Sequence, residues 1–257
     1  LGLQTDTKFC STCTTKKEIS MTKDYIKSVL QKYYNHFASK GLMVHSVALK
    51  GSQNYNLDDE ESDIDANLVF IPTLQQLRSA TKFKEVFEEG EVTCHNIYHF
   101  AEIVAKGNPQ WVEVCNTEYF VGEPLTFFQQ YKLNPTAVKG MIMEHVEAFS
   151  RLYPSREKYV KQFGYDPKQL HHIIRLYDLL ASGQQVYKYS NEQKQHMLDI
   201  KRGRFPSSVE EAEALRDSYL DKLSTIYQQL KDSYKPQTID FDYLDKEVLN
   251  RYKTHYN

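Results

Sequence analysis

The stretch 51–65, which reads GSQNYNLDDEESDID, constrains the chain more than any other part of its sequence. A Gly-Ser pair follows a short apolar run, and two aspartates then bracket Ile64 in front of a second apolar run. If residues 63–71 form a strand, alternation with a period of two puts Asp63 and Asp65 on one face and Ile64 on the other. Neighbouring carboxylates repel each other, so this arrangement is most stable where a cation neutralises them.

These oxygen ligands and the Gly-Ser pair together predict a site for phosphoryl transfer. Paired carboxylates suit Mg²⁺ or Mn²⁺, which usually keep several waters and take further ligands from substrate phosphates. Gly51 lets the backbone approach a phosphate closely, and backbone N–H groups with the Ser52 hydroxyl can bind the anion. The two halves of the stretch therefore supply complementary parts of one site.

Gly-Ser at the end of one apolar segment, with Asp-x-Asp opening the next, is a specific combination. It resembles the signature of the DNA polymerase β-like nucleotidyltransferase superfamily, and the text of 51–65 is similar to the bacterial and phage branch of predicted nucleotidyltransferases. The resemblance implies a nucleoside triphosphate bound by Gly51 and Ser52. It also implies that Asp63 and Asp65 are catalytic residues that bind Mg²⁺ or Mn²⁺.

The superfamily normally adds a third carboxylate from a neighbouring strand, and two registers of the sequence compete for that position. Glu91 opens a predicted strand over 91–97, and in one register it is the third catalytic and metal-binding acid. The other register places Thr93 there and leaves the site one ligand short. The resemblance favours Glu91. The same sequence would also fit a Glu91 that is simply a solvated acid in an acidic turn with Glu88 and Glu89.

A second group of candidate residues lies on a predicted helix over 167–182. Lys168, His172 and Arg175 stand at i, i+4 and i+7, so they share one helix face. Spacing alone is typical of a solvated basic face. The text YDPKQLHHIIRLYDLL, however, resembles the Lys-x-x-x-His-x-x-Arg helix of the same branch, which implies that all three residues bind the triphosphate. His171 points about 100° away from this stripe.

The fold class that follows is α+β, with a small mixed α/β nucleotidyltransferase domain over 21–130 and an all-helical domain over 131–257. The sequence predicts helices over 22–39 and 98–106, and strands over 43–49, 63–71 and 91–97. Beyond Pro135 the patterns are helical only. The resemblance implies an active site in the cleft between the two domains. The acids at 58–61 are predicted to form a solvated loop, and the basic cluster at 201–204 to end a helix at the surface.

Composition limits the partners of the protein. The formal net charge is −2 over 257 residues, which indicates no long nucleic-acid footprint. Residues 1–20 are predicted to be a flexible leader in which Cys10 and Cys13 are incidental, because no second cysteine or histidine pair follows to complete a zinc site. The sequence shows neither a signal peptide nor an apolar run long enough to cross a bilayer, which predicts a cytoplasmic protein with no membrane partner.

Two functions of different classes fit the sequence. The first is an enzyme, a nucleotidyltransferase whose hydroxyl acceptor is an RNA 3′ end, a small molecule or a protein. The second is a nucleotide-sensing or partner-binding protein that keeps the fold with an eroded metal site. The two functions differ in whether the metal site has a third carboxylate, which the sequence leaves open.

Overall fold

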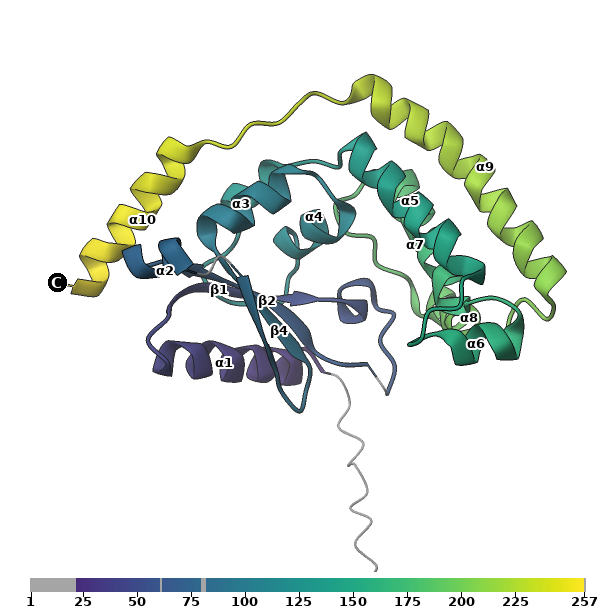
Figure 1. Ribbon diagram of the computed structural model, residues 1–257, viewed down its shortest axis with the longest axis horizontal. Coiled ribbons are helices and arrows are strands. Elements are labelled where there is room, and N and C mark those ends of the chain that lie inside the picture. Colours follow the sequence, from purple (N-terminus) through teal and green to yellow (C-terminus); the bar gives the residue numbers. More distant parts are fainter. Residues whose placement is uncertain (1–21, 61, 80–81, 257) are drawn as a thin grey trace, which may run out of the picture.

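The computed structural model describes residues 22–60, 62–79 and 82–256 and shows a mixed α+β protein (Figure 1). The predicted leader, with Cys10 and Cys13, lies outside the described residues. Within them, Cys94 and Cys115 are buried and form no disulfide. No helix in the described ranges is both long enough and apolar enough to cross a membrane.

A five-stranded mixed sheet forms the centre of the α/β part. Its strand order is β3-β4-β2-β1-β5, in which β2 and β4 are parallel and every other neighbouring pair is antiparallel. The strands are β1 (Met43–Lys50), β2 (Asp65–Ile71), β3 (Lys82–Val86), β4 (Glu91–Asn96) and β5 (Phe120–Gly122). The chain between β2 and β3 carries the short helix α2 (Leu74–Ser79).

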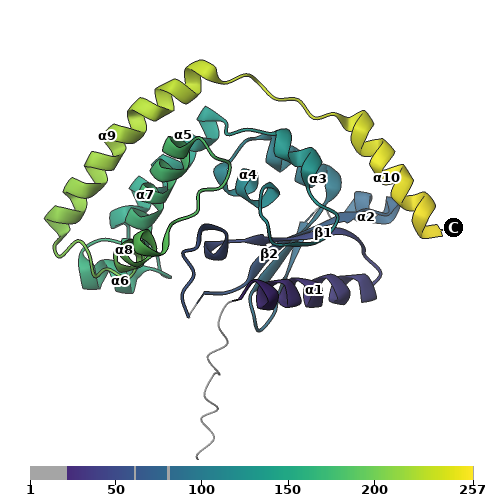
Figure 2. The ribbon, with the colours of Figure 1, turned by 180° about the vertical axis from the view of Figure 1, so that it is seen from behind.

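Helices cover both faces of this sheet (Figures 1 and 2). On one face lies α1 (Lys23–Ser39), whose buried side chains pack on alternate residues of β1, β2 and β4 such as Leu68 and Val92. On the other face lie α3 (Ile97–Ala105), α4 (Pro109–Cys115) and the 3-10 helix η2 (Thr126–Gln130). Because the faces alternate along each strand, the apolar pattern of β2 fixes which way its polar residues point.

Five further helices form the helical part of the molecule. They are α5 (Pro135–Ser150), α6 (Glu157–Phe163), α7 (Pro167–Ser182), α8 (Asn191–Lys201) and α9 (Val209–Ser233). The central helix α7 packs against α5, α8 and α9. Asp166 caps its first turn by accepting the N–H of Lys168, and Gly183 ends it in the left-handed conformation. The predicted helix over 167–182 is confirmed.

The last helix, α10 (Phe241–Tyr256), returns to the α/β part (Figure 1). Leu244 and Val248 are buried in the core under α3, and the Tyr98 hydroxyl donates to Asp245 at 2.8 Å. The predicted helical domain over 131–257 includes this helix, whereas the structure packs it on the α/β part. Chain order alone could not show this, because the connection after α9 is long enough to cross the molecule.

Candidate functional site

The pairing of β1 with β2 brings the Gly-Ser turn and the Asp-Ile-Asp segment together. Lys50, at the end of β1, faces Asp65 at the start of β2. The next residues form the 3-10 helix η1 (Ser52–Tyr55), in which the Gln53 side chain donates to the Asp63 carbonyl at 2.7 Å. The Ser52 hydroxyl donates to Ser62 Oγ at 3.3 Å. The two halves of the sequence motif are therefore neighbours at one end of the sheet.

Gly51 makes the turn out of β1 possible. Its φ of 112° and ψ of −158° lie in a region that is essentially restricted to glycine. This conformation turns the chain directly from the last residue of β1 into η1. A side chain at position 51 would strain that turn.

The Asp63-Ile64-Asp65 segment is fixed through its central residue. Ile64 is buried, its N–H donates to the Glu89 carbonyl at 2.7 Å, and its carbonyl accepts the Tyr33 hydroxyl at 3.1 Å. Gly90 packs so closely that a Cβ there would lie 2.5 Å from the Ile64 carbonyl oxygen. With Ile64 in the α1 core, Asp65 points toward the opposite side of the sheet. Regular strand geometry begins at Asp65, two residues later than predicted.

Glu91 opens β4 beside Asp65 and donates its backbone N–H to Asp65 Oδ1 at 2.9 Å. Its own carboxylate is 3.0 Å from Lys84 Nζ, and the hydrogen bond from Lys84 is the main reason why the pKa of Glu91 is lowered. Thr93 lies on the same face and pairs with Asn67, one step further into the sheet. Glu91 is thus level with Asp65, while Thr93 is deeper.

The donor set of Asp63 and Asp65 fits Mg²⁺ or Mn²⁺, which need only one or two protein carboxylates when waters and substrate phosphates complete the shell. Asp63 is exposed and Asp65 is half-buried, so both can reach a solvated ion. Across residues 22–60, 62–79 and 82–256, no three His, Cys, Asp or Glu side chains converge on a point that could hold a metal. To act as a third ligand, the Glu91 carboxylate would have to release Lys84 and bind the ion instead.

Lys50 is a further candidate, which the sequence motif did not indicate. Residues directly opposite in an antiparallel ladder share a face, so Lys50 extends on the same side as Asp65. Its charge also contributes to the lowered pKa of Glu91, after the larger effect of Lys84. The sequence does contain a signal for Lys50. It is the last strand residue before Gly51, and it lies two residues after Ala48, so strand alternation places both on one face.

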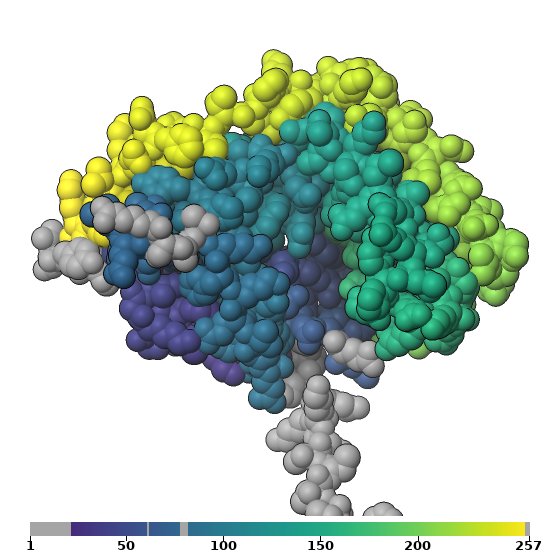
Figure 3. Space-filling model, viewed as in Figure 1, coloured from purple at the N-terminus to yellow at the C-terminus, as the bar shows by residue number. Residues whose placement is uncertain are grey.

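The predicted basic stripe on α7 lies where the helical part meets the α/β part, and Figure 3 shows a hollow in the surface between them. Lys168 is exposed, but surrounding atoms displace part of its water, and this together with Arg156 and Lys201 lowers its pKa. Asp65 acts on the same pKa in the opposite direction. Lys168 is therefore within electrostatic reach of the aspartate site.

The other two members of the stripe occupy different surroundings. His172 stacks on His145 of α5 with ring centroids 4.9 Å apart, and burial lowers its pKa well below the usual range. Arg175 donates from Nη1 to Glu113 Oε1 at 2.6 Å, and both side chains are buried. Burial alone would lower the pKa of Arg175, but the Glu113 carboxylate outweighs that effect and raises it.

Tyr55, at the end of η1, completes this buried group. Its hydroxyl donates to Glu113 Oε2 at 2.9 Å, and the Arg175 guanidinium lies 4.2 Å from the centroid of its ring. Arg175 is predicted to bind the triphosphate, whereas the structure pairs its charge with Glu113. The geometry links α4, α7 and the turn that begins at Gly51.

The basic cluster at 201–204 ends helix α8 as predicted, but the acidic loop differs from the prediction because it pairs with this part of the chain. Asp58 pairs with Lys194 at 3.2 Å, and Asp59 pairs with Lys201 and Arg202 at 3.3 Å each. The prediction of a fully solvated acidic loop is therefore wrong for Asp58 and Asp59. The pairing was not visible in the sequence because the partners are more than a hundred residues apart.

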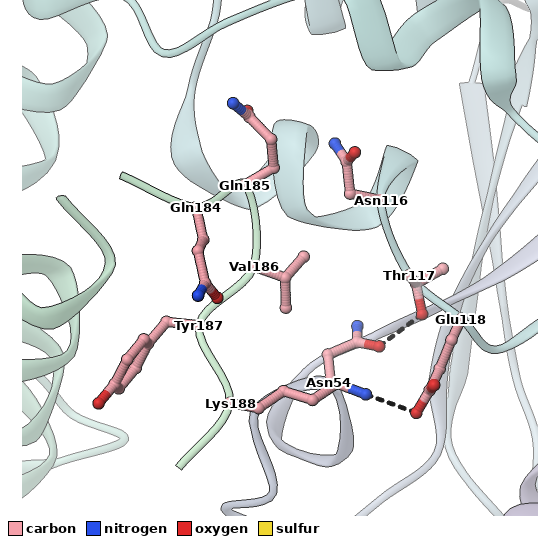
Figure 4. A pocket seen from close by; sticks show the side chains of 9 residues that line it. All are labelled: Asn54, Asn116, Thr117, Glu118, Gln184, Gln185, Val186, Tyr187 and Lys188. Carbon is pink, nitrogen blue, oxygen red and sulfur yellow. Dashed lines mark hydrogen bonds and ion pairs between the residues drawn. The ribbon is translucent and has the colours of Figure 1, made fainter. Parts of the chain in front are cut away.

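A pocket of about 620 Å³ opens on another side of η1 (Figure 4). Asn54 accepts a hydrogen bond from Thr117 on its wall, and Lys188 pairs with Glu118 across it at 2.5 Å. None of the residues predicted to bind metal or nucleotide lines this pocket. Its lining consists of Asn54, Asn116, Thr117, Glu118, Gln184, Gln185, Val186, Tyr187 and Lys188.

A scan of the chain against protein-family models finds no match, and neither does a search of curated proteins. Among solved structures, the chain is similar to a nucleotidyltransferase-like protein from Exiguobacterium sibiricum 255-15. That similarity covers 80% of this chain and 75% of the other, at 15% sequence identity and a TM-score of 0.31. A likeness this distant establishes neither a family nor an activity, so the functional conclusion depends on the residues of the site.

Proposed function

We propose that this protein is a metal-dependent nucleotidyltransferase, which moves a nucleoside monophosphate from a nucleoside triphosphate to a hydroxyl acceptor. The observation that carries the proposal is the β1–β2 register, which brings the Gly51-Ser52 turn beside the segment that holds Asp63 and Asp65. Phosphate-binding backbone and metal-binding carboxylates are the two requirements of this chemistry. The proposed active site lies between the α/β part and α7, from which Lys168 supplies a cation.

In the proposed reaction, the acceptor oxygen forms a bond to the α-phosphorus, and the bond between the α-phosphorus and the bridging oxygen breaks. Pyrophosphate leaves with that electron pair, and the acceptor proton passes to a base. Asp63 and Asp65 would hold Mg²⁺ or Mn²⁺, which supplies Lewis-acid stabilisation of the charge on the phosphoryl and leaving oxygens. Gly51, Ser52 and Lys168 bind and orient the polyphosphate.

Glu91 has two proposed roles in this site. It is the nearest further carboxylate on the strand beside Asp65, so it can serve as the third metal ligand and as the proton acceptor. Both roles require its carboxylate to leave Lys84. This requirement is also the observation that favours the second candidate function, a nucleotide-binding protein without transfer activity.

Incubation of the protein with each labelled triphosphate and Mg²⁺ or Mn²⁺ tests the proposal. The acceptors supplied are total RNA, a protein extract and a panel of small hydroxyl compounds. Calorimetric titration with a non-hydrolysable triphosphate supplies a readout that does not depend on the acceptor. Transfer of label with release of pyrophosphate supports the enzyme, and binding without transfer to any acceptor supports the second candidate. Absence of both overturns the proposed function.

Replacing Glu91 with Gln is expected to lower the transfer rate by about 10–100-fold, whereas Thr93→Val is expected to change it little. Gln keeps the size of the side chain and the backbone N–H that Asp65 accepts, and removes only the charge. Steady-state rates for the two variants decide between the registers. The opposite order would assign the position to Thr93 and leave the metal with two carboxylates.

A further inference from the structure

The carboxylate of Asp59 occupies a site built for an anion. Only 10% of its side chain is exposed, and Lys201 Nζ and Arg202 Nη2 both approach Oδ2 at 3.3 Å. The Ser62 hydroxyl donates to Oδ1 at 2.8 Å. Burial acts to raise the pKa of Asp59, but the hydrogen bond from Ser62 and the charge of Lys201 outweigh it, so the pKa is lowered. The carboxylate is therefore ionised at neutral pH.

This anion site lies one hydroxyl group away from the Gly-Ser turn. Ser52 donates to Ser62, and Ser62 donates in turn to Asp59. A group that replaced the Asp59 carboxylate would consequently meet the Ser62 hydroxyl and lie next to Ser52. The Ser62 side chain alone therefore bridges the anion site and the proposed phosphate-binding turn.

A further cation, Lys168, lies near the two that bind Asp59. Lys168 and Lys201 are close enough for Lys201 to lower the pKa of Lys168. Both cations, together with Arg175, also lower the pKa of His171, for which burial is the main cause. His171 is only 5% exposed, and neither ring nitrogen has a hydrogen-bond partner among the described residues. A cationic, incompletely satisfied environment of this kind favours a ligand with more charge and more acceptor oxygens than a carboxylate.

We infer that Asp59 stands in for a substrate phosphate: Lys201 and Arg202 receive the terminal phosphates of a nucleoside triphosphate, and Asp59 yields these cations when nucleotide binds. The inference rests on the proposed function for the identity of the ligand. A terminal phosphate carries about −2 charge near neutral pH and three acceptor oxygens, so it competes well with a single carboxylate for an arginine and a lysine.

Competition of this kind predicts the sign of a mutational effect. A site that Asp59 fills for about 70–90% of the time has its apparent affinity reduced about three- to tenfold. Replacing Asp59 with Asn should therefore tighten triphosphate binding by about that factor. A purely structural contact between the loop and α8 predicts the opposite, because its loss would loosen the site.

The test is calorimetric titration of wild type, Asp59→Asn, Asp58→Asn and Lys201→Ala. The probes are a non-hydrolysable triphosphate with Mg²⁺ and inorganic tripolyphosphate alone. Asp58→Asn is the matched control, because it removes the same charge from the same loop but its partner is Lys194. The expected results are tighter binding for Asp59→Asn, a change of less than about twofold for Asp58→Asn, and weakening of about tenfold or more for Lys201→Ala.

Unchanged or weaker binding by Asp59→Asn overturns the inference, as does an equal gain in Asp58→Asn. The two probes distinguish a failure of this inference from a failure of the proposed function. If tripolyphosphate binds and Asp59→Asn tightens it, while no nucleotide binds, the anion site stands and the nucleotidyltransferase proposal fails. If no protein binds either probe, both fail. Melting temperatures of all four proteins, measured in parallel, show whether each remains folded.

Discussion

Replacing Asp65 with Asn is expected to reduce nucleotidyl transfer by about a hundredfold or more, since even residues that only orient a metal ligand contribute about 10–100-fold. Asn keeps an oxygen that can accept the Glu91 N–H, so the junction of β2 and β4 should survive. Without metal, removal of one of two neighbouring charges should leave the melting temperature unchanged or higher. The measurements are steady-state rates, calorimetric affinity for Mg²⁺ with nucleotide, and thermal unfolding.

Asp63→Asn should behave like Asp65→Asn, because both carboxylates are proposed metal ligands and neither is buried. The control is Glu88→Gln, which removes an exposed acid from the β3–β4 turn and should change the rate less than twofold. A loss of less than tenfold for either aspartate, with Mg²⁺ affinity unchanged, would contradict their assignment as metal ligands.

Elements with a strong local pattern were predictable from the sequence. In α1 the residues Ile26, Leu30, Tyr33 and Phe37 recur at helical spacing, and all four are buried against the sheet. The apolar run of β1 ends just before the Gly-Ser pair, and that of β2 begins just after the aspartates. Pairing of these two strands therefore brings the Gly-Ser turn near the aspartates. Hydrophobic periodicity carries this information because burial of one face stabilises each element.

The strand β3 was not predicted. Its residues alternate between exposed and half-buried, with Lys82, Lys84 and Val86 exposed, so the sequence lacks an apolar run. It becomes a strand because it pairs with β4 at the edge of the sheet. Lysines on an edge strand also discourage further pairing. That role depends on the tertiary fold and leaves only a weak signal in the sequence.

Contacts between distant charges were not predictable for a related reason. Many lysines, arginines and acids are available, and which of them meet is decided by how α7 and α8 dock on the α/β part. Asp59 with Lys201, and Glu113 with Arg175, are pairs of this type. The sequence identified Arg175 as a functional candidate by its spacing, but spacing does not reveal whether a carboxylate already neutralises it.

Replacing Glu113 with Ala is expected to lower the free energy of unfolding by about 3–5 kcal/mol, because it leaves the buried Arg175 charge without its partner. Arg175 extends from α7 to Glu113 on α4, lies against the ring of Tyr55 and is only 6% exposed, so its charge stays buried. Urea denaturation followed by circular dichroism measures the loss. The matched control is Glu118→Ala, which breaks exposed ion pairs and should cost about 0–1 kcal/mol.

The double variant Glu113→Ala with Arg175→Met should recover part of the lost stability, because it removes the unpaired charge and leaves an apolar side chain of similar length. Tyr55→Phe removes one hydrogen bond to Glu113 and should cost about 0.5–3 kcal/mol. Tyr55 lies three residues after Ser52, so even this variant should weaken triphosphate binding through the position of the turn. A Glu113→Ala variant that is no less stable than Glu118→Ala would show that the buried pair does not hold α7 against the Gly-Ser turn.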